Sequence, residues 1–284
     1  MHGVKMKDNL NVSNLLRIYE TEISKNVKNK KKLYDFEINK MQYVEDIINM
    51  LNNGVVGHKH YNIFLIFEPK CRLVMSLSVK DKVINHFVTR YILEAKLSKY
   101  LDCRNVATRK GMGTDYAIKK VIKYINILKR KYKIFYVLKL DISKYFYCID
   151  HEVLKGLLID KLDDYEYNIV SEIIDTTNKE YINKTINKLK EDRDIPNYLY
   201  GKGLPIGNMT SQFLSIYYLY KLDYFIVHDL GLKYYIRYMD DFIILDSDLE
   251  KLKEAKEKIV EKLEMEYKLK VNGKKTWINN MKYG

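Results

Sequence analysis

Apolar side chains recur along the chain at two spacings, one typical of helices and one typical of strands. Segments 35–52, 79–100 and 114–131 carry apolar residues every three or four positions, which predicts three amphipathic helices. In the third segment, lysines and an arginine fill the remaining positions, a pattern that by itself indicates a solvated face. Between the first two, FLIFEPKCRLVMSLS predicts a β-hairpin with its turn at Pro69 and Lys70.

Further apolar runs predict strands in the second half of the chain. IFYVLKLD, which ends at Asp141, is dense in β-branched and aromatic residues, and a helix is expected to begin near His151. YYIRYMDDFIILD, residues 234–246, has two acids between apolar arms, which predicts a hairpin. Ser247 and Glu250 form a capping-box pattern ahead of another helix.

The order of these elements indicates the fold class. Asn272 and Gly273 mark a tight turn between LKV and KKTWI, and no internal repeat or low-complexity tract interrupts the chain. Strands and helices alternate without a steady βαβ rhythm. We therefore expect an α+β fold with a small antiparallel sheet rather than a doubly wound fold.

Composition and charge narrow the class of protein. Apolar residues make up 47% and charged residues 31% of the 284 positions, which excludes disorder for most of the chain. Lys and Arg number 50 against 37 Asp and Glu, and this net charge of +13 favours a polyanionic partner such as nucleic acid. The abundance of Lys, Asn, Ile and 26 Tyr is also what AT-rich coding DNA produces, so the charge alone leaves both explanations open.

Several classes of site and location are excluded by what the sequence lacks. Cys71, Cys103 and Cys148 are too far apart for a disulfide framework or a zinc finger. His58 and His60 have no third ligand nearby and are expected in a solvated loop. No stretch approaches the roughly 18 uncharged apolar residues of a membrane helix, and the N-terminus lacks a secretory signal. We expect a cytoplasmic protein with no membrane partner.

Three acids are the most informative residues for chemistry. Asp141 ends a predicted buried strand, and Asp240 and Asp241 lie in a predicted hairpin. Carboxylates are costly to bring together unless a cation lies among them. Two magnesium ions bridged by such acids can activate an attacking hydroxyl and stabilise a pyrophosphate leaving group, which is nucleotidyl transfer. Taken singly, Asp141 could instead cap a helix, and the acid pair could simply form a turn.

Over nearly its whole length the chain resembles reverse transcriptases, because the family's motifs occur in the family's order. DISKYF, which begins at Asp141, resembles the first palm motif, YMDD at 238–241 the second metal motif, and KKT at 274–276 the later lysine-bearing palm motif. PKCRLV resembles the fingers motif that holds the incoming triphosphate. RKGMGT at 109–114 resembles the next fingers motif, which lies against the template strand. The resemblance implies a right-hand polymerase.

The resemblance also implies roles for individual residues. Those assigned to catalysis are Asp141, Asp240, Asp241 and Lys275, the three acids being the metal ligands. Those assigned to the incoming nucleotide are Lys70, Arg72, Phe146, Ile206, Gly207, Ser211 and Gln212. Those assigned to template and primer are Arg109, Lys110, Gly111 and Tyr238. The implied cofactor is two Mg²⁺ ions, or Mn²⁺ in their place, and the implied partners are a template RNA, a DNA or RNA primer and dNTPs.

Physical reasoning agrees with these roles but leaves an alternative for several residues. Phe146 can stack on a deoxyribose and leave no room for a 2′-hydroxyl, although an aromatic beside a strand more often packs in the core. Lys275 can donate a proton to the leaving group, or it can be a solvated turn lysine. Tyr238 can lie beside the primer end or pack in the sheet. Gly207 would let the backbone come close to the nascent base pair.

The stretch GLPIGNMTSQ at 203–212 narrows the subfamily. Most reverse transcriptases have Gln before the internal glycine and end the motif with Ser-Pro, whereas this chain has Ile206 and Ser211-Gln212. The IGxxxSQ form is similar to that of diversity-generating retroelement enzymes. Those enzymes copy a template-repeat RNA with errors at adenines, the cDNA replaces a variable repeat in a target gene, and a basic accessory variability protein assists them. The chain would then be encoded by a bacterium or a phage.

Two other functions remain open. One is another bacterial reverse transcriptase, of the phage-defence, abortive-infection, group II intron or retron type. The other is an inactive nucleic-acid-binding remnant without a thumb, since the chain stops at Gly284 soon after Trp277, where the family continues into a helical thumb. We expect fingers at 1–135, a palm at 136–284 with a fingers insertion at about 156–205, no thumb, and weak primer-template binding.

Overall fold

The structure is a computed structural model that describes residues 6–58, 60–67 and 70–281. The chain divides into two compact units. Unit 1 comprises Met1–Lys99 and Leu154–Leu214, and unit 2 comprises Tyr100–Val153 and Ser215–Gly284. The division does not coincide with the predicted fingers and palm boundary after residue 135, because the predicted helix at 114–131 belongs to unit 2.

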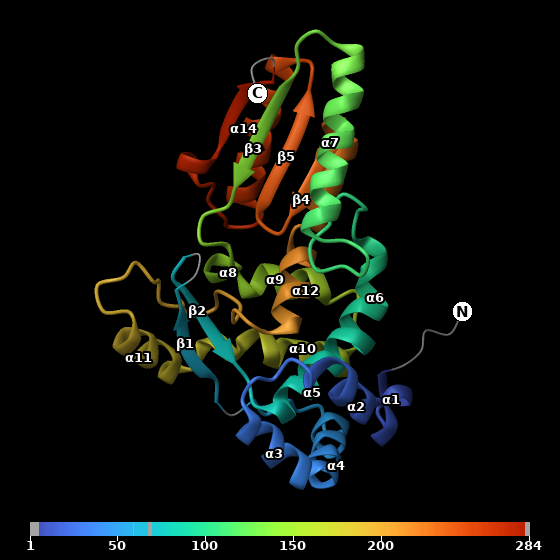
Figure 1. Cartoon of the computed structure of the whole chain (residues 1–284), viewed down its shortest axis with the longest axis vertical. Coiled ribbons are helices and arrows are strands. Elements are labelled where there is room, and N and C mark those ends of the chain that lie inside the picture. The colour runs from blue at the N-terminus through green and yellow to red at the C-terminus, as the bar shows by residue number, and fades with distance from the viewer. Residues whose placement is uncertain (1–5, 59, 68–69, 282–284) are drawn as a thin grey trace. The chain divides into compact units, whose positions relative to one another are not determined.

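Unit 1 combines helices with one antiparallel hairpin (Figure 1). The hairpin strands are β1 (Asn62–Ile66) and β2 (Arg72–Ser76). The helical elements are α1 (Met6–Asn9), α2 (Val12–Ile18), η1 (Tyr19–Ile23), α3 (Lys30–Ile38), α4 (Lys40–Asn52), α5 (Val79–Val88), η2 (Thr89–Glu94), α6 (Ala95–Leu97), α10 (Asp164–Ile174), η4 (Asp175–Asn178) and α11 (Glu180–Leu189). The elements that contain residues of both units are η3 (Ser98–Tyr100), α9 (His151–Leu158) and α12 (Met209–Tyr218).

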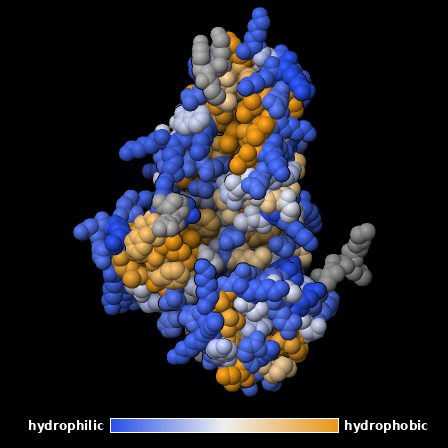
Figure 2. All heavy atoms as spheres, in the orientation of Figure 1, coloured by the Kyte–Doolittle hydropathy of each residue, from blue (hydrophilic) through white to orange (hydrophobic). Residues whose placement is uncertain are grey.

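The predicted hairpin is confirmed, and its register explains its two faces. Ile63 and Leu73 are buried, whereas Phe64 and Ile66 are exposed and share a face with Arg72, which pairs with Ile66. Figure 2 shows hydrophobic residues gathered over this hairpin. The predicted turn residue Pro69 lies outside the described residues.

Two expectations for unit 1 differ in detail. The run at 79–100 is helical throughout, but the run at 35–52 divides into α3 and α4 at Asn39. The Asn39 side chain donates a hydrogen bond to the carbonyl of Asp35 at 2.9 Å, a local bond that competes with helix continuation. We also expected His58 in a solvated loop, and this was wrong.

His58 is buried in a polar network of unit 1. Its Nε2 accepts a hydrogen bond from Asn85 Nδ2 at 2.8 Å, and Asn85 Oδ1 in turn accepts one from the Thr210 hydroxyl at 2.6 Å. Burial, with a smaller contribution from Lys179, lowers the pKa of His58 to about 3, so the imidazole is neutral in the folded protein. The partners are far away in sequence, and local patterning therefore gave no sign of this burial.

Unit 2 is built on a four-stranded antiparallel sheet with the strand order β4-β5-β3-β6 (Figure 1). The strands are β3 (Tyr136–Asp141), β4 (Tyr234–Tyr238), β5 (Asp241–Asp246) and β6 (Trp277–Asn280). The helical elements are α7 (Thr114–Lys131), α8 (Tyr145–Cys148), α13 (Tyr220–Tyr224), η5 (Phe225–Asp229), α14 (Leu249–Met265) and η6 (Gly273–Lys275). Helix α7 packs on β4 and β5, and α14 packs on β3 and β5.

The strand and helix predictions for unit 2 are confirmed, with two corrections at the ends of elements. The N-cap of α14 is Asp248, whose side chain accepts from the Lys251 amide at 3.1 Å, and not Ser247. The turn at Asn272 and Gly273 leads into η6 and does not join two paired strands, because β6 pairs with β3. Within residues 6–58, 60–67 and 70–281, we find no helix with the length and apolar character needed to cross a lipid bilayer.

Candidate active site

One end of the unit 2 sheet brings the three predicted acids together. Asp141 is the last residue of β3 and Asp241 the first of β5, and the antiparallel register makes them direct partners. Asp240 precedes Asp241 in the turn from β4. Asp141 is buried, and the other two acids are half-buried. The pairing follows from the apolar arms of the strands, because the neighbouring Phe242 is buried on the opposite face.

The acids carry negative charge that the fold only partly compensates. Burial, together with smaller contributions from the charges of Asp241 and Asp141, raises the pKa of Asp240 to about 6. Among the described residues, none donates a hydrogen bond to the Oδ1 of Asp241, but the Nζ of Lys139 forms an ion pair with it at 3.4 Å. Within residues 6–58, 60–67 and 70–281, no three His, Cys, Asp or Glu side chains lie close enough together to form a metal site as they stand. Lys139 and Lys275 offset part of the negative charge of these acids.

Lys275 lies directly on Asp141. The amide of Asn272 donates to the Asp141 carbonyl at 2.8 Å, and the Asp141 amide donates to the Thr276 hydroxyl at 3.4 Å, so the segment before β6 is fastened to the end of β3. The Nζ of Lys275 is then 2.9 Å from Oδ2 and 3.2 Å from Oδ1 of Asp141. This hydrogen bond raises the pKa of Lys275. Lys275 is therefore more than a solvated turn lysine.

The two aromatic candidates, Phe146 and Tyr238, are not fully buried. Tyr145 is the buried residue of α8, and its hydroxyl donates to the Ser215 carbonyl at 2.6 Å. Phe146 is only half-buried and lies edge-on to Tyr145, with the ring centroids 5.9 Å apart. Tyr238 is half-buried as well and pairs with Asp241 across β4 and β5. Neither aromatic is simply a core residue.

The residues predicted to bind the nucleotide, other than Phe146, lie in unit 1. Lys70 and Arg72 are exposed at the hairpin, with Arg72 opening β2. The carbonyl of Ile206 accepts from the Met75 amide at 2.8 Å, which fastens the 206–207 turn to β2. Gly207 has φ 118°, and a Cβ there would lie 2.9 Å from the Met75 carbonyl oxygen. Glycine is therefore required at 207 because the backbone passes close to β2 of the same chain.

The rest of the GLPIGNMTSQ motif faces different surroundings. Ser211 is buried, and its hydroxyl has no hydrogen-bond partner in the part of the chain that the structure describes, whereas Gln212 is exposed. Asn208 is buried and donates from Nδ2 to the Tyr61 hydroxyl at 2.8 Å. Ile206 is half-buried and Gly207 is exposed, so both are more accessible to a ligand than the buried Ser211.

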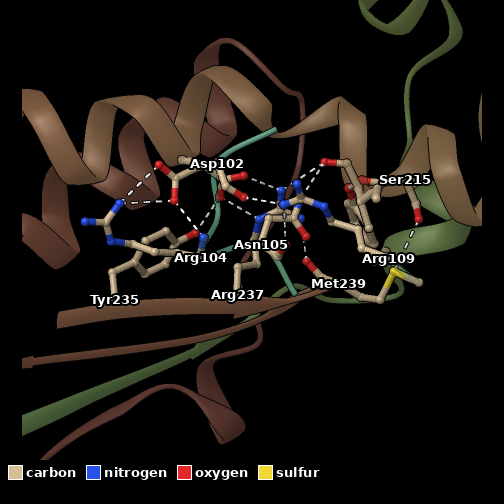
Figure 3. Close-up of polar contacts among 11 residues, drawn as sticks. Asp102, Arg104, Asn105, Arg109, Ser215, Tyr235, Arg237 and Met239 are labelled. Carbon is tan, nitrogen blue, oxygen red and sulfur yellow. Dashed lines mark hydrogen bonds and ion pairs between the residues drawn. The ribbon is translucent and has the colours of Figure 1, made fainter. Parts of the chain in front are cut away.

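The three residues predicted to contact template and primer in the RKGMGT segment differ in availability. The Arg109 guanidinium donates to the carbonyls of Asp102 at 2.6 Å and Asn105 at 3.0 Å, so it holds its own loop together (Figure 3). Lys110 and Gly111 are exposed. Gly111 has φ 74°, a conformation that favours glycine. Only the last two are presented to solvent.

Comparison with known proteins agrees with this geometry. Residues 58–283 match the model of the family described as reverse transcriptase (RNA-dependent DNA polymerase). The chain belongs to the reverse transcriptase family. No curated protein sequence matches it.

Solved structures of telomerase share the fold of this reverse transcriptase chain. Apo telomerase from Candida tropicalis, truncated from its C-terminal domain, aligns with TM-score 0.55 and 16% identity over 80% of this chain and 51% of that chain. Telomerase from Candida albicans, in complex with a TWJ fragment of telomeric RNA, aligns with TM-score 0.51 and 16% identity over 81% of this chain and 43% of that chain. The chain thus spans about half the length of the truncated telomerase.

Sequence reasoning missed one buried ion pair in unit 2. Arg237 of β4 and Asp223 of α13 are both completely buried, with Nη2 and Oδ2 2.6 Å apart. A usable signal existed, because Arg237 occupies an inward-facing position of a hydrophobic strand immediately before YMDD. Such a position is occupied by a charge only when a partner is present.

Proposed function

We propose that this chain is the catalytic portion of an RNA-directed DNA polymerase. The observation that supports it most directly is the meeting of Asp141, Asp240 and Asp241 at one end of a sheet, with Lys275 on the first of them, in a member of the reverse transcriptase family. Template RNA, a DNA or RNA primer and dNTPs are the proposed substrates. A pure nucleic-acid-binding protein would gain nothing from carboxylates beside a polyanion.

The three acids suit divalent metal ions. Carboxylate oxygens are the hard ligands that Mg²⁺ prefers, and a bound cation would relieve the repulsion from Asp241 and Asp141 that, after burial, raises the pKa of Asp240. Asp141, Asp240 and Asp241 would hold two Mg²⁺ ions, or Mn²⁺ in their place. When bound, the ions activate the primer hydroxyl and stabilise the charge that develops on the pyrophosphate.

The chain's own residues supply the remaining functions. Lys275 carries a proton at neutral pH, as lysines ordinarily do, and can deliver it to the leaving pyrophosphate. Lys70 and Arg72, exposed at the hairpin, bind the triphosphate of the incoming nucleotide. Phe146 excludes a ribose 2′-hydroxyl by occupying its space.

The experiment is primer extension on an RNA template with Mg²⁺. Asp240→Asn keeps the size of the side chain and removes the negative charge, so nucleotide addition should be abolished. Asp246→Asn is the matched control, because Asp246 lies at the opposite end of β5 from Asp241. This variant should keep its activity. Equal extension by wild type and Asp240→Asn contradicts the assignment. A wild type that binds RNA but adds no nucleotide favours the inactive remnant.

Within this activity, we infer that the enzyme is of the diversity-generating retroelement type, with a basic accessory variability protein as a further partner. Ile206 supports the inference, because its side chain is partly accessible on a turn held to β2 and offers no hydrogen bond to a nascent base pair. A misaligned pair should then be penalised less than with Gln in this position.

Single-nucleotide extension opposite each of the four RNA bases tests the subtype. Ile206→Gln should lower misincorporation opposite adenine, and about 1.4 kcal/mol of differential transition-state stabilisation changes the error ratio tenfold. High wild-type accuracy at adenine would remove the retroelement assignment. DNA synthesis without any template would instead favour the abortive-infection type.

A further inference from the structure

The turn that carries the catalytic acids has a strained backbone. Met239 joins β4 to Asp240 and has φ 55°, in the left-handed region that a residue with a side chain rarely adopts. Such a conformation persists only where the surrounding structure fixes it. Something must therefore hold the Met239 peptide unit in place.

The Arg237 guanidinium supplies that hold. It is fully buried, and its Nη1 donates to the Met239 carbonyl at 2.9 Å. Its Nε and Nη2 donate to the two carboxylate oxygens of Asp223 at 2.7 and 2.6 Å, and Nη2 also donates to the Ile216 carbonyl at 2.9 Å. The planar fork of an arginine can make these bonds together, which the single ammonium of a lysine cannot.

The main chain of Arg237 is fixed as firmly as its side chain. The Arg237 amide donates to the Arg104 carbonyl at 3.0 Å, and its carbonyl accepts from the Val106 amide at 3.0 Å. The Asn105 side chain between them donates to the same Ile216 carbonyl at 3.2 Å. Figure 3 shows this group in one view, with Met239 at its edge beside Ser215, whose hydroxyl is 3.4 Å from the Met239 sulfur. The guanidinium is thus a fixed point of unit 2.

Stability alone is a poor reason for such a pair. Burying two charges incurs a desolvation penalty that their attraction barely offsets, and apolar residues of similar volume are often as stable. The bond that apolar residues cannot make is the one to the Met239 carbonyl. We propose that the Asp223–Arg237 pair positions the Met239–Asp240 turn, so that the carboxylates of Asp240 and Asp241 are held in place for catalysis. The inference rests on the proposed polymerase function and names two positioning residues for it.

The test uses a double variant that removes both charges. Arg237→Met alone would leave the buried Asp223 without its counter-charge and would strongly destabilise the protein, so it is combined with Asp223→Leu. Circular dichroism and the melting temperature establish that the double variant is folded. The matched control is Tyr235→Phe, because the Tyr235 hydroxyl donates to Asp223 Oδ1 at 2.6 Å from the same strand but does not contact the turn.

Two readouts separate positioning from general stability. In the double variant kcat for nucleotide addition should fall about 10- to 100-fold, as when residues that orient metal ligands are lost, while KM for dNTP and the primer-template Kd stay unchanged. Hydrogen exchange at the Met239–Asp241 amides should be at least about tenfold faster than in wild type. Tyr235→Phe should match wild type in both.

The outcomes are distinguishable from failure of the proposed function. A folded double variant with the kcat of wild type overturns the inference, and so does Tyr235→Phe with an equal loss of kcat. If wild type itself adds no nucleotide, the polymerase proposal fails, and the exchange measurement alone then decides. Unchanged exchange at the turn in the folded double variant overturns the positioning role.

Discussion

Phe146 lies at the end of the first palm-like motif with part of its ring open to solvent. Shortening it to Ala should open space for a 2′-hydroxyl and raise ribonucleotide incorporation relative to deoxynucleotide. The loss in free energy of unfolding should stay below the roughly 3 to 5 kcal/mol typical of a fully buried phenylalanine, because Phe146 is only half-buried. Competing ribo- and deoxynucleotide extension, with thermal melting alongside, measures both quantities.

The control for this residue is Phe146→Tyr, which keeps the ring and should keep the sugar selectivity. A Phe146→Ala variant that loses stability in the full range for a core residue, with unchanged sugar choice, would assign Phe146 to packing instead.

His58 gives a pH dependence with a definite sign. Its pKa is about 3 when folded and about 6.5 when unfolded, so below pH 6.5 only the unfolded chain takes up this proton. The stability that His58 contributes is complete above pH 6.5 and decreases as pH falls toward 3, by up to about 1.4 kcal/mol per pH unit. Urea unfolding of wild type and His58→Gln from pH 7 to 5 should show their difference changing by about 2 kcal/mol. A constant difference would mean that His58 is solvated.

At the scale of helices and strands, the sequence predicts what depends on periodicity. The helix at 114–131 and the hairpin at 234–246 are recovered because their apolar spacing is regular over many residues. The ends of elements are less predictable, since several nearby polar side chains can each cap or interrupt a helix. The break at Asn39 and the cap at Asp248 were decided by single hydrogen bonds.

The start of α14 allows a direct comparison of two neighbours. Asp248→Ala removes the side chain that accepts from the Lys251 amide and should destabilise the protein by about 1 kcal/mol. Ser247→Ala removes the hydroxyl that the sequence pattern favoured and should change stability by less than about 0.5 kcal/mol. Chemical denaturation of both variants decides, and a larger loss at Ser247 would contradict the capping geometry.

At the scale of the whole molecule, the charge of +13 is unevenly distributed among helices. Helix α7 has six basic residues and one acid, whereas α14 has five lysines and five glutamates. Figure 2 shows hydrophilic residues along the outer side of α7. Coding bias would have no reason to separate charge in this way, so we expect α7 to contact phosphates.

Nucleic-acid binding should therefore depend strongly on salt and weakly on sequence. RNA affinity should fall about 100-fold or more between 50 and 200 mM salt if several phosphates are contacted. Lys119→Ala with Lys123→Ala on α7 should reduce the slope of log K against log salt by about 1.4 for single-stranded RNA. Lys256→Ala with Lys258→Ala on α14 is the control and should leave it unchanged. A flat salt profile in wild type would make the net charge a product of coding bias.

The candidate site could be predicted only as far as its motifs are continuous in sequence. Asp141 was proposed because it ends a readable strand, and Asp240 and Asp241 because they lie at the centre of a readable hairpin. Arg237 could have been noticed as a charge within a hydrophobic strand, but its partner Asp223 could not, because the pair joins a strand to a helix that no local pattern connects. Gly207 was singled out, but its close approach to β2 was not foreseen, because that strand is far away in the sequence.

Under the proposed roles, the hydrogen bond from the Met75 amide to the Ile206 carbonyl couples the residue beside the nascent base pair to the hairpin that binds the triphosphate. Arg72 opens the strand in which Met75 lies, and Gly207 leaves almost no clearance against that strand. A triphosphate that displaces Arg72 would therefore also displace the turn that carries Ile206. Binding of the triphosphate and tolerance of a mispaired base would then be coupled through β2. Selection could then tune the error rate through hairpin residues that never touch a base.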